Sequence, residues 1–197
     1  MKDLPEHMDA RAEDAQLMAR YAAGDMAAAR VLSARLSPRA YAHAYRVLGD
    51  SAEAEDVAQE ALLRLWKQAA KWDAGRAQAS TWVYRVVANL CTDRLRKRRE
   101  SGLDEVDVPA DPSAGVEARM QDAARYDALQ AALLRLPERQ RQAVILRHIE
   151  GLANPEIAEI LDVGVEAVES LTARGKRALT ADLAAQRDAL GYDDDTV

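Results

Sequence analysis

The stretch NPEIAEILDVGVEAVESLTARGKRAL, residues 154–179, decides the fold. Asn154 and Pro155 are typical of the first turn of a helix, and the tripeptide DVG is typical of a tight turn. The apolar spacing therefore predicts a very short helix, a three-residue turn and a longer helix over residues 165 to about 190. Two helices joined in this way form a helix-turn-helix, whose second helix often enters the major groove of DNA.

The rest of the chain also has a helical pattern. Alanine outnumbers valine, isoleucine and threonine together, which favours helix over strand. Helices are predicted at residues 9–23, at 25–36, after a restart at Ser37 and Pro38, after an N-cap at Asp50, from Ser80 to about residue 99, at 122–136 and at 137–151. We therefore expect an all-α protein with almost no β-structure.

Residues 100–118 differ in composition from the segments on either side. They hold two prolines, two glycines and six acidic residues, and no basic residue. This composition predicts a flexible acidic linker between two small helical domains, residues 1–99 and residues 119–197, the second of which contains the helix-turn-helix.

The composition also excludes several kinds of function. Cys91 is the single cysteine, and the three histidines form no metal-ligand pattern, so we expect neither metal nor cofactor. No G-x-S-x-G or P-loop pattern occurs, and no carboxylate has a partner suited to acid-base work, so we expect no enzyme. The acidic N-terminus is no signal peptide, and no apolar stretch could insert into a membrane. We expect a soluble cytoplasmic protein.

A net charge of −6 argues at first against nucleic acid binding. The charges are segregated, however, because the segment from Arg85 to Arg99 holds six basic residues and one acid, Asp93. Its C-terminal run RLRKRR exceeds what a helix end needs to balance its dipole. Residues 73–80 and this basic helix together predict a surface for phosphates and unstacked bases. The alternative is a helix whose arginines only complement its dipole.

The helix that follows Asp50 is amphipathic. Val57, Ala61 and Leu65 lie on one arc, whereas Leu63 lies among acidic and amide side chains on the other. The plain interpretation is a solvated face with one stray leucine. The sharper interpretation is a protein-docking surface, since an apolar anchor ringed by carboxylates suits a partner with arginines and an apolar notch.

In the second helix of the helix-turn-helix, the spacing predicts that four residues face inward: Val168, Leu171, Gly175 and Leu179. Its outward side chains include Glu166 and Arg174, which can reach base edges in a major groove. The alternative is packing of this helix against another protein.

Three segments together resemble a known family. They are DVAQEALLRLW at residues 56–66, STWVYRVVANLCTDRLRKRR at 80–99, and LPERQRQAVILRHIEGL at 136–152, followed by the helix-turn-helix. In this order they resemble the extracytoplasmic-function (ECF) sigma factors of bacterial RNA polymerase, over nearly the whole chain. The resemblance implies a subunit that directs promoter-specific initiation.

The resemblance also implies three sets of binding residues. The clamp helices of the polymerase β′ subunit would bind Asp56, Gln59, Glu60, Leu63 and Trp66, and the β flap would be a further contact. The promoter minus-10 element would contact Arg76, Ser80, Thr81, Trp82, Arg85, Asn89, Arg96 and Arg99. The minus-35 element would contact Glu166, Glu169, Ser170, Ala173, Arg174 and Arg177. The acidic linker would run near the polymerase active-site channel.

Some positions depart from the family pattern. Glu169 and Leu171 stand where many relatives carry Lys or Arg, so the base preference at minus-35 cannot be borrowed from them. Asp162 occupies a turn site that is often Gly, at some cost in left-handed geometry. The last helix is similar to alphaproteobacterial members that a zinc-binding anti-sigma factor holds inactive in stress responses. A stand-alone helix-turn-helix repressor, which would need a dimer, is the alternative hypothesis.

Overall fold

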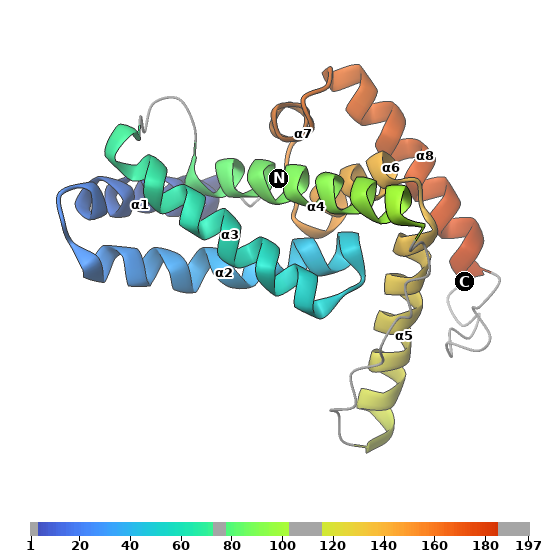
Figure 1. The fold of residues 1–197 in the computed structure, drawn as a ribbon. Coiled ribbons are helices and arrows are strands. Elements are labelled where there is room, and N and C mark those ends of the chain that lie inside the picture. Colours follow the sequence, from blue (N-terminus) through green and yellow to red (C-terminus); the bar gives the residue numbers. More distant parts are fainter. Residues whose placement is uncertain (1–3, 73–77, 103–115, 185–197) are drawn as a thin grey trace. The chain divides into compact units, whose positions relative to one another are not determined.

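The computed structural model describes residues 4–72, 78–102 and 116–184. Within these ranges every regular element is a helix (Figure 1). The all-α prediction is therefore confirmed. The chain divides into two compact units, one made of Met1–Tyr45 and Ser51–Arg94, the other of Arg46–Asp50 and Leu95–Val197. The divisions after Tyr45 and after Arg94 fall inside the helices Met26–Leu48 and Ala79–Ser101, and the one after Asp50 falls at the start of the helix Ser51–Gln68. The predicted domain boundaries at residues 99 and 118 stay predictions.

The N-terminal part of the chain holds α1 (Leu4–Ala22), α2 (Met26–Leu48), α3 (Ser51–Gln68), the short η1 (Ala69–Lys71) and α4 (Ala79–Ser101). The C-terminal part holds α5 (Val116–Arg135), α6 (Glu138–Val144), η2 (Ile145–Ile149), α7 (Asn154–Leu161) and α8 (Val165–Ala184). The predicted short helix, DVG turn and long helix correspond to α7 and α8. Residues 116–118, predicted as linker, lie in α5, because helix-forming residues follow the last glycine of that segment.

The turn between α1 and α2 is held by Asp25. Its carboxylate accepts hydrogen bonds from the backbone N–H groups of Ala27 and Ala28, at 2.9 and 3.3 Å, and so caps α2. The Arg20 guanidinium donates to the same carboxylate at 2.9 and 2.7 Å. The hydrogen bond from Arg20, followed by those from the backbone, lowers the pKa of Asp25. Further along, Arg35 of α2 pairs with Glu13 of α1 at 2.6 Å, so the two helices lie side by side.

The predicted restart at Ser37 and Pro38 is wrong, because α2 continues through both residues. Proline lacks the N–H that would pair with the carbonyl of residue 34, a loss that normally favours a break. Leu32 and Leu36 before the proline, and Ala40 after it, are nevertheless buried on one side of the helix. Burial of this continuous apolar side outweighs the local cost of the proline.

The core of the first unit is apolar and is drawn from all of its long helices. It includes Met18, Leu32, Leu36, Ala40, Ala44, Val57, Ala61, Leu65, Val83, Val87 and Cys91. His43 is fully buried there, with its ring edge-on to Tyr84 at 5.5 Å between centroids. This core fixes the outward directions of α3 and α4, on which the candidate site depends.

In the second unit, α8 packs on α6 through a glycine. A Cβ atom at Gly175 would lie 2.5 Å from Cγ2 of Val144 and 3.2 Å from the Gln140 carbonyl oxygen. Neither distance leaves room for a methyl group. Gly175 therefore sets how closely α8 approaches α6, and with it the height of the exposed side of α8 above the core.

The C-terminal end of α5 is closed by a buried arginine. Arg141 donates hydrogen bonds from Nη2 to the Leu134 and Leu136 carbonyl oxygens, at 2.7 and 3.1 Å. Carbonyls at a helix end have no partner within their own helix, so the guanidinium supplies one. After α6 the helix widens for one turn in η2, where the Glu150 N–H bonds to the Ile145 carbonyl at 3.0 Å. The helical stretch ends at Gly151, as predicted.

The turn of the helix-turn-helix has the expected left-handed residue. Asp162 has φ 52° and ψ 54°, and its neighbour Val163 donates its N–H to the Ala158 carbonyl at 3.1 Å. At the other end of α7 the Glu156 carboxylate accepts from the Ala153 N–H at 2.9 Å. Both ends of α7 are thus closed by local hydrogen bonds, which holds the short helix in place although it has only eight residues.

Candidate functional site

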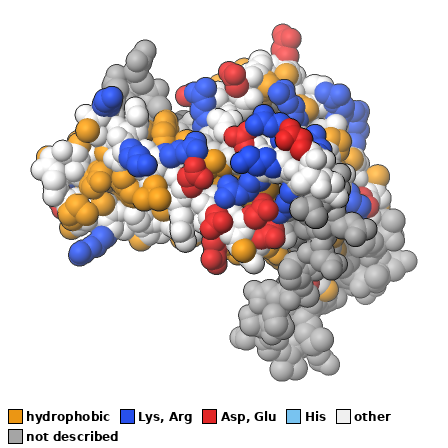
Figure 2. All heavy atoms as spheres, in the orientation of Figure 1, with side chains coloured by type: hydrophobic (Ala, Val, Ile, Leu, Met, Phe, Trp, Pro, Cys, Tyr) orange, Lys and Arg blue, Asp and Glu red, His pale blue; other side chains and the backbone are white. Residues whose placement is uncertain are grey.

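The exposed side of α3 carries the leucine that the sequence singled out. Leu63 is 58% exposed, whereas Val57, Ala61 and Leu65 of the same helix are buried. Asp56, Gln59 and Glu60 share its side of the helix, and the Asp56 side chain is 72% exposed. The structure therefore brings these four predicted residues together. Figure 2 shows apolar side chains gathered over the end of the first unit where α1 ends and α2 begins.

Trp66 lies at the edge of that surface rather than on it. Its ring is half-buried and packs edge-on against Tyr21 of α1, with 4.9 Å between the ring centroids. An aromatic ring held in this way has little freedom to lose when a partner covers it.

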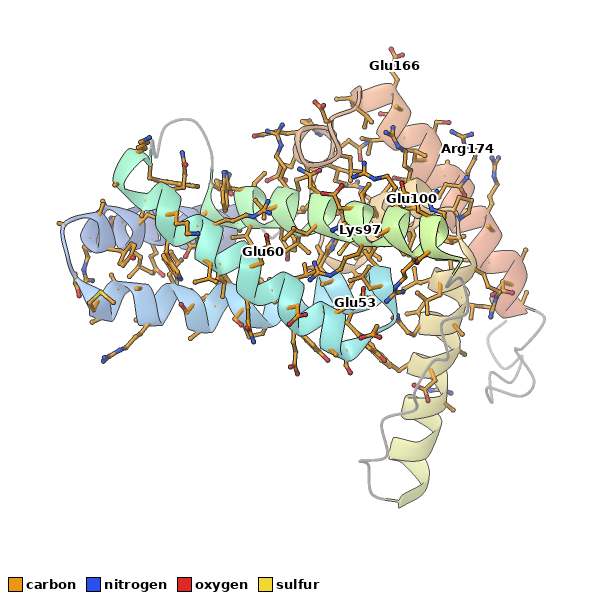
Figure 3. The ribbon with its side chains drawn as sticks, viewed as in Figure 1. Glu53, Glu60, Lys97, Glu100, Glu166 and Arg174 are labelled. Atoms are coloured by element: carbon orange, nitrogen blue, oxygen red, sulfur yellow. The ribbon has the colours of Figure 1, made fainter. Side chains whose placement is uncertain are left out.

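Two arginines that the sequence analysis did not select contact the acidic side chains of α3. Arg64 donates to Glu60 at 2.5 Å, one helical turn away, and both side chains are partly exposed. Arg94 of α4 lies 3.9 Å from a Glu53 carboxylate oxygen and 4.0 Å from one of Asp56. The four-residue spacing of Glu60 and Arg64 was a usable signal. The approach of Arg94 was not, because it depends on how α4 packs on α3. Figure 3 labels Glu53 and Glu60 on this helix.

Along α4, Arg85, Asn89, Arg96 and Arg99 are exposed, as predicted. Ser80 and Trp82 are half-buried, and Arg76 lies outside the described residues. Thr81 is only 6% exposed, so its prediction as an outward contact is wrong. On the helix it lies beside Tyr84 and Ala88, which are both buried, because the buried arc of α4 is wider at its start than the alternation of valines suggested.

The basic residues of α4 do not all point outward. Arg98 donates to the Leu48 carbonyl at 3.1 Å, and its side chain is only 15% exposed. Together with Arg94, it forms an inward pair one turn apart, on the side of α4 away from Arg85. The two arginines fasten α4 to its neighbours, so they add no charge to the outward cationic stripe, for which the sequence had not selected them.

Two tryptophans flank the segment before α4. Trp72 and Trp82 pack edge to face with ring centroids 6.2 Å apart. The Trp72 indole N–H is buried and finds no acceptor among the described residues. The pair places aromatic rings beside the start of the cationic stripe. Proteins that bind single-stranded nucleic acid combine aromatic rings and positive charge in this way.

All six predicted residues of α8 are exposed: Glu166, Glu169, Ser170, Ala173, Arg174 and Arg177. Val168 and Gly175 are buried as expected, while Leu171 and Leu179 are half-buried. Figure 3 shows Glu166 projecting beyond the start of α8 and Arg174 extending from its side. The Arg174 Nε donates to the Ser170 carbonyl at 3.2 Å, so the guanidinium is held along the helix.

A histidine, His148, lies close to Lys176 of α8. Burial lowers the pKa of His148, and the nearby charges of Lys176 and Arg147 lower it further. At neutral pH its imidazole is therefore neutral and adds no charge to that surface. Within the part of the chain that the structure describes, no cluster of three or more His, Cys, Asp or Glu side chains could hold a metal ion, and no helix is long and apolar enough to cross a membrane.

Comparison with known proteins identifies the two halves of the chain. Residues 32–101 match the family model Sigma-70 region 2, and residues 126–179 match Sigma-70, region 4. The ECF RNA polymerase sigma factor SigW of Bacillus subtilis is 32% identical over 154 residues, which span 73% of this chain and 82% of that protein. The chain belongs to the ECF sigma factor family. It is therefore a transcription initiation factor that binds core RNA polymerase and directs it to promoters, and the stand-alone repressor hypothesis is not favoured.

Two solved structures are also similar to this sigma factor. CnrH, determined in complex with the cytosolic domain of CnrY, is 28% identical, with a TM-score of 0.65 over 88% of this chain and 98% of that chain. The sigma factor RpoE of Bartonella quintana, determined with the anti-sigma factor NepR, is 21% identical, with a TM-score of 0.64 over 80% and 98%. At that identity the second likeness shows the fold alone.

Proposed function

We propose that this sigma factor binds polymerase through the exposed side of α3 and promoter DNA through α4 and α8. The observation that carries the proposal is Leu63, a large apolar side chain exposed among carboxylates on an otherwise well-packed helix. We place its action in the cytoplasm, where polymerase and chromosome are, and assign it no catalysis of its own.

The α3 surface has the composition of a small docking site. An exposed leucine supplies an apolar anchor, and a ring of polar groups around such an anchor excludes water once a partner covers it. Asp56 and Glu60 complement a basic partner, because opposite charges across an interface speed association and fix its register. The clamp helices of the β′ subunit are the proposed partner, with the β flap as a second contact.

The stripe on α4 and the tryptophan pair support binding to the minus-10 element. Arg85 and Asn89 are exposed one turn apart, suited to phosphates and to base edges. Trp82 lies at the border of the stripe, where its ring could stack on an unpaired base. Opening of the duplex at this element would expose such bases.

The exposed side of α8 supports reading of the minus-35 element as duplex. The first residues of α8 come directly after the turn of the helix-turn-helix. In such motifs the N-terminal residues of the second helix contact base edges. Arg174 and Arg177 are suited to phosphates or guanine, and Ala173 could contact a thymine methyl group.

An anti-sigma factor is the proposed regulator, in keeping with a role in a stress response. Such a partner would cover both the α3 surface and the side of α8 near Arg174, because the free protein would otherwise compete for polymerase. CnrH, which is similar to this chain, was determined with the cytosolic domain of another protein. Any zinc in this regulation would belong to the partner. Failure to recover any partner protein by pull-down from the native cell would count against regulation by an anti-sigma factor.

The polymerase contact is tested with paired variants of the full chain. Leu63→Glu should reduce binding to core polymerase at least tenfold, since it places a charge at the centre of the interface. Val31→Glu is the matched control, because Val31 is also exposed but lies on α2. Asp56→Arg should weaken binding through charge reversal, with Glu55→Arg as its control. Equal polymerase binding by Leu63→Glu and wild type, with helical content unchanged, would remove α3 as the docking helix.

A further inference from the structure

Glu169 lies on the edge of the exposed side of α8 that is nearest to α7. Its carboxylate oxygen Oε1 accepts a hydrogen bond from Nδ2 of Asn154, the first residue of α7, at 3.5 Å. Arg174 lies on the opposite edge of the same exposed side, held along the helix by its bond to the Ser170 carbonyl. The two edges of the proposed groove-facing side therefore carry opposite charges.

A carboxylate in a DNA groove has few acceptable partners. An ionised carboxylate only accepts hydrogen bonds, so it gains nothing from phosphate oxygens and is repelled by their charge. Base edges are the remaining partners. Guanine offers two acceptors in the major groove, thymine offers an acceptor and a methyl group, and adenine offers a donor with an acceptor beside it. Cytosine offers the N4 amino donor, which is the group that Glu side chains take.

The Asn154 amide restricts where the Glu169 carboxylate can lie. A side chain that is held before binding loses less conformational freedom when it meets its target. The carboxylate keeps further acceptor positions beyond the one that Asn154 occupies. Glu169 thus combines an orientation favoured by Asn154, remaining acceptor capacity and a charge that penalises every partner without a donor.

We infer that Glu169 is a specificity-determining residue that selects a cytosine in the minus-35 element by accepting a hydrogen bond from its N4 amino group, with Asn154 as its positioning residue. This inference rests on the proposed function, in which α8 reads that element as duplex. It assigns to this one side chain a base preference that differs from the preference of the Lys or Arg that many relatives carry at the same position.

The test is selection from a library of promoter fragments randomised across the minus-35 element. Each full-length variant is assembled with core polymerase, the bound fragments are sequenced, and the enrichment of each base is compared. Wild type should enrich cytosine at one position. Glu169→Gln should reduce that enrichment about fivefold or more at this position alone, because an amide also suits other bases. Glu159→Gln is the matched control, since Glu159 is an exposed carboxylate on α7. It should leave the base preference unchanged.

Asn154→Ala separates positioning from stability. It should weaken the cytosine preference while leaving the thermal midpoint of the protein unchanged, a combination that a purely structural role would not produce. The inference is overturned if Glu169→Gln and wild type enrich the same bases equally, or if the base that responds to the change is not cytosine. If wild type enriches no sequence upstream, reading of the minus-35 element by α8 and this inference both fail.

Discussion

Replacing Gly175 with alanine should destabilise the packing of α8 on α6. The added Cβ would lie 2.5 Å from Cγ2 of Val144, whereas carbon atoms in good contact are about 3.5–4.0 Å apart. Val144 is buried and β-branched, so its side chain has one strongly preferred rotamer in a helix and cannot turn away freely. The Gln140 carbonyl, at 3.2 Å, is backbone and yields still less.

Two effects of opposite sign decide the size of the change. Alanine is a better helix former than glycine by about 1 kcal/mol, which favours the variant. Overpacking a well-filled contact costs about 1–3 kcal/mol, and the gap here is short by about 1 Å or more against a stiff neighbour. We expect the upper part of that range, so the second unit should lose about 1–2 kcal/mol of free energy of unfolding.

Hydrogen exchange measured by mass spectrometry on peptides from α6 and α8 gives the local stability directly. Gly164→Ala is the control, because a Cβ at Gly164 meets nothing within 4 Å. The double change Gly175→Ala with Val144→Ala should restore part of the contact by removing the methyl group that clashes. Slower exchange in Gly175→Ala than in wild type would mean that helix propensity dominates, and would refute the packing argument.

Three further changes test other parts of the fold. Pro38→Ala should stabilise the first unit by about 1–3 kcal/mol, because it restores a hydrogen bond inside α2. The tryptophan fluorescence of Trp66, Trp72 and Trp82 reports on that unit in urea, and a lower midpoint than wild type would contradict the prediction. Arg141→Ala should destabilise the second unit by about 2–3 kcal/mol through loss of its bonds to the Leu134 and Leu136 carbonyls. Circular dichroism in urea measures this, with the exposed Arg139→Ala as control, and equal midpoints would rule out the capping role. Asp25 has a lowered pKa, so its ionised form stabilises the folded chain above the ordinary aspartate pKa of about 3.9, and this stability is lost as the pH falls through the lower folded value. Asp25→Asn should therefore show a smaller fall in thermal midpoint on acidification than wild type, and an identical fall would exclude this carboxylate as a source of acid sensitivity.

The amphipathic pattern of α3 could be predicted correctly from sequence because each of its signals is local. Asp50 precedes the helix, the apolar residues recur at helical spacing, and one side packs while the other does not. Burial of Val57 and Leu65 and exposure of Leu63 follow from that spacing alone. The docking role of Leu63 is a separate matter, because the spacing does not say which partner, if any, covers it.

Local signals failed where packing outweighed them. Pro38 is a strong helix breaker in isolation, and only the buried residues on both sides of it explain why α2 continues. The valines around Thr81 define an inward arc that predicts an outward Thr81, but the width of the buried arc depends on what packs against the start of α4. Neither fact is present in the segment itself.

The inward arginines of α4 limit how strongly this protein, with its net charge of −6, binds DNA by itself. Arg94 approaches two carboxylates of α3, and Arg98 bonds to a backbone carbonyl. Each neutralised phosphate contributes to affinity and to its salt dependence, so fewer outward cations mean weaker binding by the isolated chain. Figure 2 likewise shows acidic and basic side chains close together on the displayed face.

A narrow stripe on an acidic protein suits a subunit whose DNA affinity is completed by polymerase, since strong binding alone would hold it on DNA without the enzyme. On this reasoning Arg94→Ala and Arg98→Ala should reduce DNA binding less than Arg85→Ala does in the assembled holoenzyme, and an equal loss would place all three arginines against the phosphates.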